Sequence, residues 1–167
     1  NIVLIREAAG IFGNQCIVVS VDVKKINGVY LVFVENGKQN TGINLSDYIK
    51  KVVEAGAGEI FLNSIDKDGT KSGYDVELFK NASQGIEVPV IACGGAGHPD
   101  HFVECINAAK VASIAAGNFF NYTEHSVITL KSYMASKNIA DLRIGTISKY
   151  VDFKFDRDGR VNKLGDD

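Results

Sequence analysis

An apolar strand that runs directly into a loop of carboxylates and glycines constrains the fold of this chain more than any other feature. The end of the strand is at residues 61–65, and the loop after it holds Asp66, Asp68, Gly69 and Gly73. A segment with helical spacing begins just beyond the loop. In α/β proteins, reacting groups lie at the carboxyl ends of parallel strands, in the loops before the helices. The segment therefore predicts an α/β fold with a functional site at this strand end.

A second segment repeats the order of apolar strand and glycine loop. Residues 88–93 are apolar, and they are followed by a loop that contains Gly94, Gly95 and Gly97. Glycines let a backbone approach an anion closely and leave N–H groups free to donate. The loop is therefore a candidate phosphate site; the competing interpretation is a tight turn with a purely structural role.

Length, composition and charge exclude several classes of protein. The chain has 167 residues, 46% apolar and 23% charged, so one soluble globular domain is expected. A formal charge of -2 gives no electrostatic reason to expect nucleic acid or an anionic membrane as a partner. No apolar run is long enough to span a bilayer, and no signal peptide is recognisable. The chain starts without Met and inside a helical pattern, so we expect a fragment of a longer protein.

The cysteines and histidines do not have the spacing of a metal site. Cys16, Cys93 and Cys105 form no CxxC pair, and we expect small buried side chains in a reducing compartment, the cytoplasm. His98 and His101 lie three residues apart, and a metal site would need further ligands. Both are expected to lie at the start of a helix as surface or capping residues. Neither a metal nor a cofactor is expected.

Predicted strands and helices alternate along the chain. A hairpin is expected at residues 29–35, which alternate in polarity between Asn27-Gly28 and Asn36-Gly37. Beyond Leu142 the pattern weakens, so residues 1–143 are predicted to form the domain and 144–167 a partly disordered extension. Within that extension, residues 150–155 could form an edge strand. The other predicted strands are 16–22, 59–65, 88–93 and 110–116, and the predicted helices are 45–55, 76–82, 98–109 and 127–137.

Strand–helix units of this kind, joined by right-handed crossovers, can build two architectures. One is a small open sheet, and the other is half of an eight-stranded barrel. The glycine loops favour the barrel, because barrels bind phosphate with the loops after their last strands.

Three segments carry a resemblance to a known family. They are GEIFLNSIDKDGTKSGYD at 58–75, PVIACGGAG at 89–97 and VASIAAGNFF at 111–120. Together they resemble the second half of the cyclase subunit of imidazole glycerol phosphate synthase, with order and spacing agreeing from about residue 11 to residue 143. The resemblance implies a (βα)8 TIM barrel, of which this chain covers the last four units.

The resemblance also implies an activity in histidine biosynthesis. The family takes ammonia from a glutaminase subunit and closes an imidazole ring on a ribulosyl-formimino aminoimidazole carboxamide ribotide. The products are imidazole glycerol phosphate and an aminoimidazole carboxamide ribotide, and the enzyme is a lyase. A phosphorylated ribotide and a glutaminase are therefore the expected partners.

Two aspartates are the candidate catalytic residues. Asp68 matches the family's catalytic aspartate after the sixth strand, and Asp22 matches a further active-site aspartate at the end of the fifth. Carboxylates at strand ends can act as general acid and base. The competing interpretations are a turn residue for Asp68 and a helix cap or structural carboxylate for Asp22. Asp66 and Asp75 are expected to be structural.

The remaining matches concern phosphate and ammonia. Gly94, Gly95, Gly117 and Asn118 match positions that bind one substrate phosphate. Glu59 begins a strand, so it would lie at the opposite mouth of a barrel, where family members gate ammonia. Its competing interpretation is an ordinary solvated charge.

Three residues depart from the family pattern and keep other functions open. Asn63 stands where the family usually has Thr, and Cys93 and Gly117 stand where it usually has Ser. The departures also fit a cyclase-like paralogue that supplies ammonia for sugar amidation in surface polysaccharide synthesis. A third possibility is a half-barrel without activity of its own. Its open strand edges at 16–22 and 110–116 would pair with another chain, for example in a homodimer.

Overall fold

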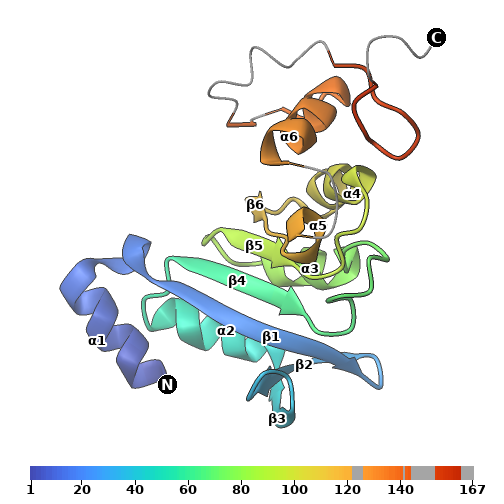
Figure 1. Ribbon diagram of the computed structural model, residues 1–167. Coiled ribbons are helices and arrows are strands. Elements are labelled where there is room, and N and C mark those ends of the chain that lie inside the picture. The colour runs from blue at the N-terminus through green and yellow to red at the C-terminus, as the bar shows by residue number, and fades with distance from the viewer. Residues whose placement is uncertain (122–125, 141, 144–152, 163–167) are drawn as a thin grey trace.

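The computed structural model describes residues 1–121, 126–140, 142–143 and 153–162. It contains a six-stranded sheet in the order β3-β2-β1-β4-β5-β6 (Figure 1). The strands are β1 (Val18–Ile26), β2 (Val29–Val34), β3 (Gln39–Asn44), β4 (Glu59–Ser64), β5 (Val90–Cys93) and β6 (Ser113–Ile114). The helices are α1 (Ile2–Phe12), α2 (Leu45–Glu54), α3 (Val76–Ser83), α4 (Pro99–Ala109), α5 (Asn118–Asn121) and α6 (Val127–Ser136).

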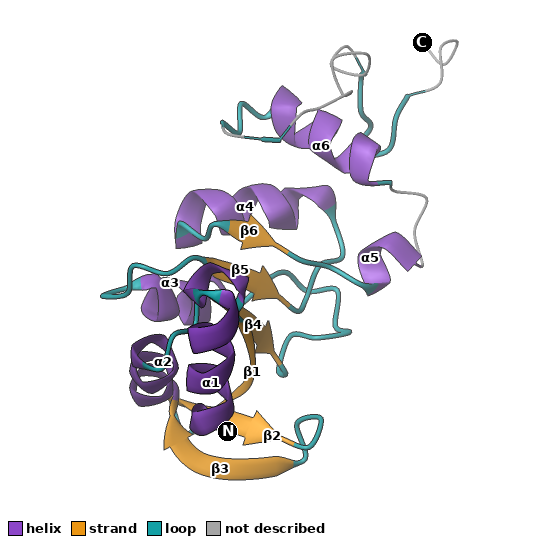
Figure 2. Cartoon of the chain, turned by 90° about the vertical axis from the view of Figure 1, so that its left-hand side faces the viewer, coloured by secondary structure: helices purple, strands orange, loops and turns teal. Residues whose placement is uncertain are grey.

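The strands β1, β4, β5 and β6 are parallel neighbours, and each is followed by helical structure before the next. Helices α2 and α3 lie on the same side of this parallel part (Figure 2). The alternation of strands and helices confirms the predicted α/β class. A parallel-rich sheet of this order is consistent with a TIM-barrel family.

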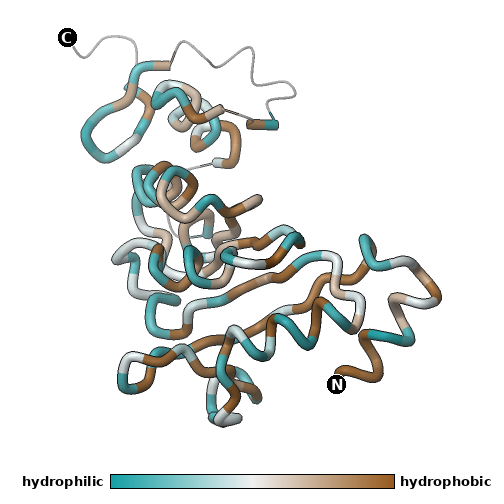
Figure 3. The backbone as a smooth tube through the Cα atoms, turned by 180° about the vertical axis from the view of Figure 1, so that it is seen from behind, coloured by the Kyte–Doolittle hydropathy of each residue, from teal (hydrophilic) through white to brown (hydrophobic). Residues whose placement is uncertain are grey.

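Burial alternates along most of the parallel strands. Val21, Leu62 and Ala92 occupy one level of the sheet and are 2%, 0% and 0% exposed, because the helices cover their face. Side chains of the opposite face are less covered: Val18 is 51% exposed, and Phe61 is half-buried. Figure 3 shows the hydrophobic colouring that runs along the central strands. The core therefore lies between the sheet and its helices, and the other face is open.

Strand register arranges this open face in rows. Asp22, Asn63 and Cys93 are paired across β1, β4 and β5. A second row holds Ser20, Phe61 and Ile91, and Val18 pairs with Glu59 at the other end. Since successive side chains of a strand point to opposite faces, the members of a row share one face. The register thus sets one polar row toward the carboxyl ends of the strands.

The predicted hairpin is confirmed and is larger than predicted. Asn27 and Gly28 both have positive φ, 49° and 83°, as a type I′ turn requires. The strand before this turn extends to Ile26, and β3, which was not predicted, adds a further strand beyond the second turn. Because β2 pairs with β1 from Asp22 to Ile26, the edge of the predicted strand 16–22 is partly covered, and the prediction of a fully open edge there was wrong.

Two strand boundaries also differ from the prediction. Cys16 lies in a 3-10 turn and is exposed, so its predicted burial was wrong. This turn packs on Gly58 so closely that a Cβ there would lie 2.1 Å from the Asn14 carbonyl oxygen. The predicted strand 110–116 shortens to β6, because Lys110 adopts a left-handed φ of 53° at the end of α4.

The described part of the C-terminal extension packs beside α4 and α6. Tyr133 donates to Asp100 at 2.5 Å and stacks edge-on against Phe155. Gly159 approaches Pro99 so closely that a Cβ would lie 2.5 Å from its Cγ. Of the edge strand considered at 150–155, residues 150–152 lie outside the described residues. Among the helices that the structure describes, none has the length and apolarity to cross a membrane.

Candidate active site

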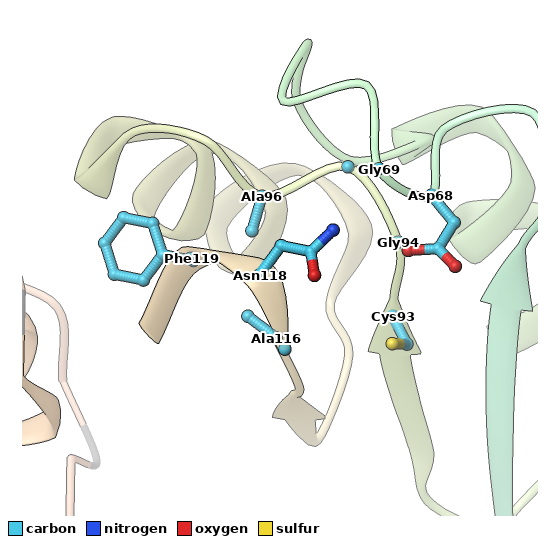
Figure 4. A pocket seen from close by; sticks show the side chains of 10 residues that line it. Asp68, Gly69, Cys93, Gly94, Ala96, Ala116, Asn118 and Phe119 are labelled. Atoms are coloured by element: carbon cyan, nitrogen blue, oxygen red, sulfur yellow. The ribbon is translucent and has the colours of Figure 1, made fainter. Parts of the chain in front are cut away.

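A hollow opens at the carboxyl ends of β4 and β5, beside the loop after β6 (Figure 4). It brings together residues from three loops that are distant in sequence. The lining residues are Asp68, Gly69, Cys93, Gly94, Gly95, Ala96, Ala116, Gly117, Asn118 and Phe119. The structure therefore gathers five of the predicted site residues, Asp68, Gly94, Gly95, Gly117 and Asn118, around one opening.

Asp68 is held by its backbone and leaves its carboxylate free. Its N–H donates to the Ser64 carbonyl at 2.9 Å, and the Thr70 N–H donates to the Lys67 carbonyl at 3.1 Å. The loop is thus a hydrogen-bonded turn, as the competing interpretation held. No described residue bonds the Asp68 side chain, however, and Figure 4 shows it beside Gly94 at the end of β5. The carboxylate is exposed.

Asp22 lies one strand farther from the hollow. It is in the middle of β1 rather than at its end, so it is neither a helix cap nor the end of a strand. Its Oδ1 accepts a hydrogen bond of 3.1 Å from the Asn63 amide. Asn63 and Cys93 lie between Asp22 and the hollow in the same row. Asp22 and Asp68 therefore share the carboxyl-end region without touching.

The glycine loop needs its glycines for steric reasons. A Cβ at Gly94 would lie 2.7 Å from the Ser64 carbonyl oxygen, and one at Gly95 would lie 2.1 Å from the Gly73 carbonyl oxygen. The two φ angles are 99° and 102°, in the region that L side chains rarely adopt. The tight-turn interpretation is therefore correct for the backbone, and it is compatible with an anion site.

Several backbone N–H groups around the hollow have no acceptor among the described residues. They include those of Gly95, Ala96, Gly117 and Asn118. Unpaired N–H groups around one hollow favour an anion, since the oxygens of a phosphate can accept hydrogen bonds from them. The Gly97 N–H does not contribute, because it donates to His101 Nδ1 at 3.2 Å.

The two histidines cap α4, as predicted. His98 Nδ1 accepts from the Asp100 N–H at 3.1 Å, and His101 Nδ1 accepts from the His98 N–H at 3.2 Å. Burial, with the neighbouring His98, lowers the pKa of His101, which favours the neutral ring that an accepting nitrogen requires. Within the described ranges no cluster of three or more His, Cys, Asp or Glu side chains could hold a metal ion.

Glu59 lies at the other end of the sheet. It is the first residue of β4, pairs with Val18 and is half-buried. It precedes Asn63 by four positions, and at about 3.3 Å per residue this is roughly 13 Å along the strand. Glu59 and the hollow are therefore on opposite ends of the parallel strands.

Sequence reasoning did not identify two polar contacts near the hollow. The Tyr74 hydroxyl donates to the Ala115 carbonyl at 3.0 Å and so ties the loop after β4 to the loop after β6. Burial raises the pKa of Tyr74 far above its usual value, which keeps the hydroxyl protonated as a donor. The sequence identified Asn63 only as a departure from the family pattern. Its contact with Asp22 depends on strand register, which no local signal reveals.

The three thiols should differ in reactivity. Burial raises the pKa of the Cys105 thiol to about 12, and burial followed by the Asp68 charge raises the pKa of Cys93. Thiolate is the reactive form and decreases as pH falls below the pKa, so both should react slowly at about pH 7.5. We expect iodoacetamide to modify the exposed Cys16 first, by mass spectrometry. The variant Cys16→Ser should lose this modification; fast labelling of Cys93 would contradict the buried geometry.

Comparison with known proteins places the chain in a family. A family model described as "Histidine biosynthesis protein" matches residues 1–126. Proteins named imidazole glycerol phosphate synthase subunit HisF are similar to it. The one from Saccharolobus solfataricus is 43% identical over 136 residues, or 81% of the chain and 54% of the relative. That of a Hydrogenobaculum species is 42% identical and that of a Thermotoga species 44%, covering 54% and 53% of those relatives. The chain spans about half the length of the curated relatives it matches, and it belongs to the histidine biosynthesis protein family, as a HisF-like member.

Proposed function

We propose that the protein carrying this chain is the cyclase of imidazole glycerol phosphate synthase, which uses ammonia to close the imidazole ring. The observation that carries the proposal is the hollow lined both by an unpaired carboxylate, Asp68, and by residues whose backbone N–H groups have no acceptor among the described residues. A phosphorylated substrate that needs proton transfer fits this combination. The relatives that share 42–44% identity bear the name of this synthase.

The residues have distinct roles in the proposed reaction. The N–H groups of Gly95, Gly117 and Asn118 bind one phosphate of the ribotide and fix its position. Asp68 transfers protons as ammonia adds to the ketone, as water leaves to give the imine and as the ring closes with release of the aminoimidazole ribotide. Asp22 serves as the further carboxylate on the same face of the sheet. Gly94 allows the close approach of the loops.

Ammonium-dependent turnover tests the proposal. The protein that carries this chain, assayed with its barrel completed, should convert the ribulosyl-formimino ribotide to imidazole glycerol phosphate with an ammonium salt as nitrogen source. The products can be separated by chromatography. If the ribotide persists while a HisF protein from a relative consumes it under the same conditions, the proposed reaction is wrong.

Ammonia would come from a glutaminase subunit at the opposite mouth, and Glu59 would gate its entry. We expect Glu59→Gln to lower glutamine-dependent turnover about tenfold, because a charge that orders the interface and channel entrance is removed. Turnover with ammonium salt should stay within about twofold, since free ammonia can reach the site directly. Glu54→Gln, a change of the exposed carboxylate at the end of α2, is the matched control. Equal losses with both nitrogen sources would rule out a gating role.

We further propose that residues 1–143 form the last four strand–helix units of an eight-unit barrel. The open face of the sheet supports this, since Val18 is 51% exposed and the half-buried Phe61 and Ile91 share a row. Another half, or a second copy, would cover the face. The chain alone would then lack part of the site and be nearly inactive, and a full rate from a monodisperse monomer would contradict this.

The departures at Asn63 and Cys93 favour one alternative, a cyclase-like paralogue that supplies ammonia for sugar amidation. Both residues lie in the polar row at the carboxyl ends of the strands. A paralogue would bind a glutaminase and a phosphate yet leave the ribotide unchanged. The ammonium assay therefore separates the two candidates.

A further inference from the structure

Asn63 occupies the central position of the polar row on the open face. It is paired with Asp22 on β1 and with Cys93 on β5. Its neighbours on both sides come from strands whose backbones are fixed by hydrogen bonds, so its side chain has little freedom to leave the row. The residue therefore links a predicted carboxylate to the strand that ends in the glycine loop.

The hydrogen bond to Asp22 defines the direction of the amide. Asn63 Nδ2 donates to Asp22 Oδ1 at 3.1 Å, and no other described residue donates to this carboxylate. An amide NH₂ gives a hydrogen bond but does not take up a proton. It occupies Oδ1 and leaves Oδ2 for a reacting group.

The other end of the amide is confined. Asn63 Oδ1 is buried and accepts no hydrogen bond in the described structure. A Cβ built on Gly94 would lie 3.1 Å from Asn63 Oδ1, so this oxygen packs against the glycine loop. A flip of the amide would place two acceptor oxygens face to face and is disfavoured. An unsatisfied buried acceptor is unusual, and it calls for an explanation in the function of the site.

We propose that Asn63 is a positioning residue that holds Asp22 with Oδ2 directed to the substrate, and couples it to the Gly94 loop. This inference rests on the proposed cyclase function for its kinetic consequence. The hydrogen bond itself does not depend on that function, and it can be tested without turnover.

The first test observes the hydrogen bond in solution. The ¹⁵N–¹H signals of the Asn63 side-chain amide, assigned through Asn63→Ala, should move in Asp22→Asn. They should remain in place in Asp47→Asn, whose exposed carboxylate lies on α2. Unmoved Asn63 signals in Asp22→Asn would overturn the contact, whatever reaction the protein catalyses.

The second test measures kcat and KM with ammonium across a range of pH. Asn63→Val should lower kcat about tenfold with KM changed less than about twofold, as expected when an oriented group loses its support. Asn63→Thr restores a donor and should recover part of kcat. Asn63→Asp places a second carboxylate beside Asp22 and should move the acidic limb of the pH profile to higher pH.

Ser83→Ala is the matched control, because Ser83 Oγ is also buried without a partner but lies on α3, outside the hollow. It should leave kcat and the pH profile unchanged. Wild-type turnover combined with an unchanged kcat in Asn63→Val would overturn the inference. Absence of turnover in the wild-type protein would instead count against the proposed function, and the amide signals would then decide the inference alone.

Discussion

Replacing Asp68 with asparagine is expected to lower kcat for ammonium-dependent ring closure by about 10²–10⁴-fold, the usual contribution of a general acid or base. Asparagine has nearly the same shape as aspartate, but it cannot exchange a proton. The Asp68 backbone N–H, which donates to the Ser64 carbonyl at 2.9 Å, is retained. The loop should therefore keep its conformation, and KM should change far less than kcat.

The stability of the variant separates chemistry from folding. No described residue forms a hydrogen bond with the Asp68 side chain. The free energy of unfolding of the variant should therefore stay within about 0.5 kcal/mol of the wild-type value, as measured by thermal unfolding. Asp47→Asn removes an exposed carboxylate at the start of α2 and should retain full activity. An Asp68→Asn protein with near-wild-type kcat would show that this carboxylate has no part in proton transfer. The assay would need to be linear in enzyme for both proteins.

The position of the hollow could be predicted from sequence because it follows from a local rule. Residues 61–65 and 88–93 are the ends of predicted strands that run into glycine loops, and parallel strands bring such loops to one edge. No knowledge of side-chain contacts is needed for this step. Asp68 and the glycines Gly94 and Gly95 were placed together by that rule, and the structure gathers them.

Features that depend on distant contacts could not be predicted. Cys16 has the apolar neighbours of a strand residue, yet the turn that contains it is fixed by the close approach of Gly58 to Asn14. The donation from Asn63 to Asp22 requires the register between β1 and β4, which residues 41 positions apart do not encode locally. The length of β6 depends on which strands lie beside it, and only β5 does among the described residues.

Replacing Gly95 with alanine is expected to lower the free energy of unfolding by about 3 kcal/mol, and Tm by roughly 6–12 °C for a chain of this size. Gly95 has a φ of 102°, and its new methyl group would lie 2.1 Å from the Gly73 carbonyl oxygen. The clash involves backbone, so no side chain can move aside. The hydrogen bond from the Gly73 N–H to the Gly95 carbonyl, 2.9 Å long, should also be strained.

Gly85→Ala isolates the contact from the backbone strain. Gly85 also has a positive φ, 76°, but a Cβ there meets nothing within 4 Å. Its substitution should cost only about 1 kcal/mol. The remaining 2 kcal/mol or so of the Gly95→Ala effect would then measure the close contact between the loops after β4 and β5. Equal losses of stability in the two variants would argue against an energetic role for that contact.

The same pair of variants tests whether this contact between the two loops shapes an anion site. A ligand that binds only the folded protein raises Tm, so inorganic phosphate should stabilise the wild type and Gly85→Ala. In Gly95→Ala the displaced loop should move its N–H groups out of position for an anion, and phosphate should no longer raise Tm. Stabilisation of all three proteins to the same degree would show that phosphate binds elsewhere. If Gly95→Ala alone loses the stabilisation, the steric requirement for glycine and the binding of phosphate are two consequences of one backbone geometry.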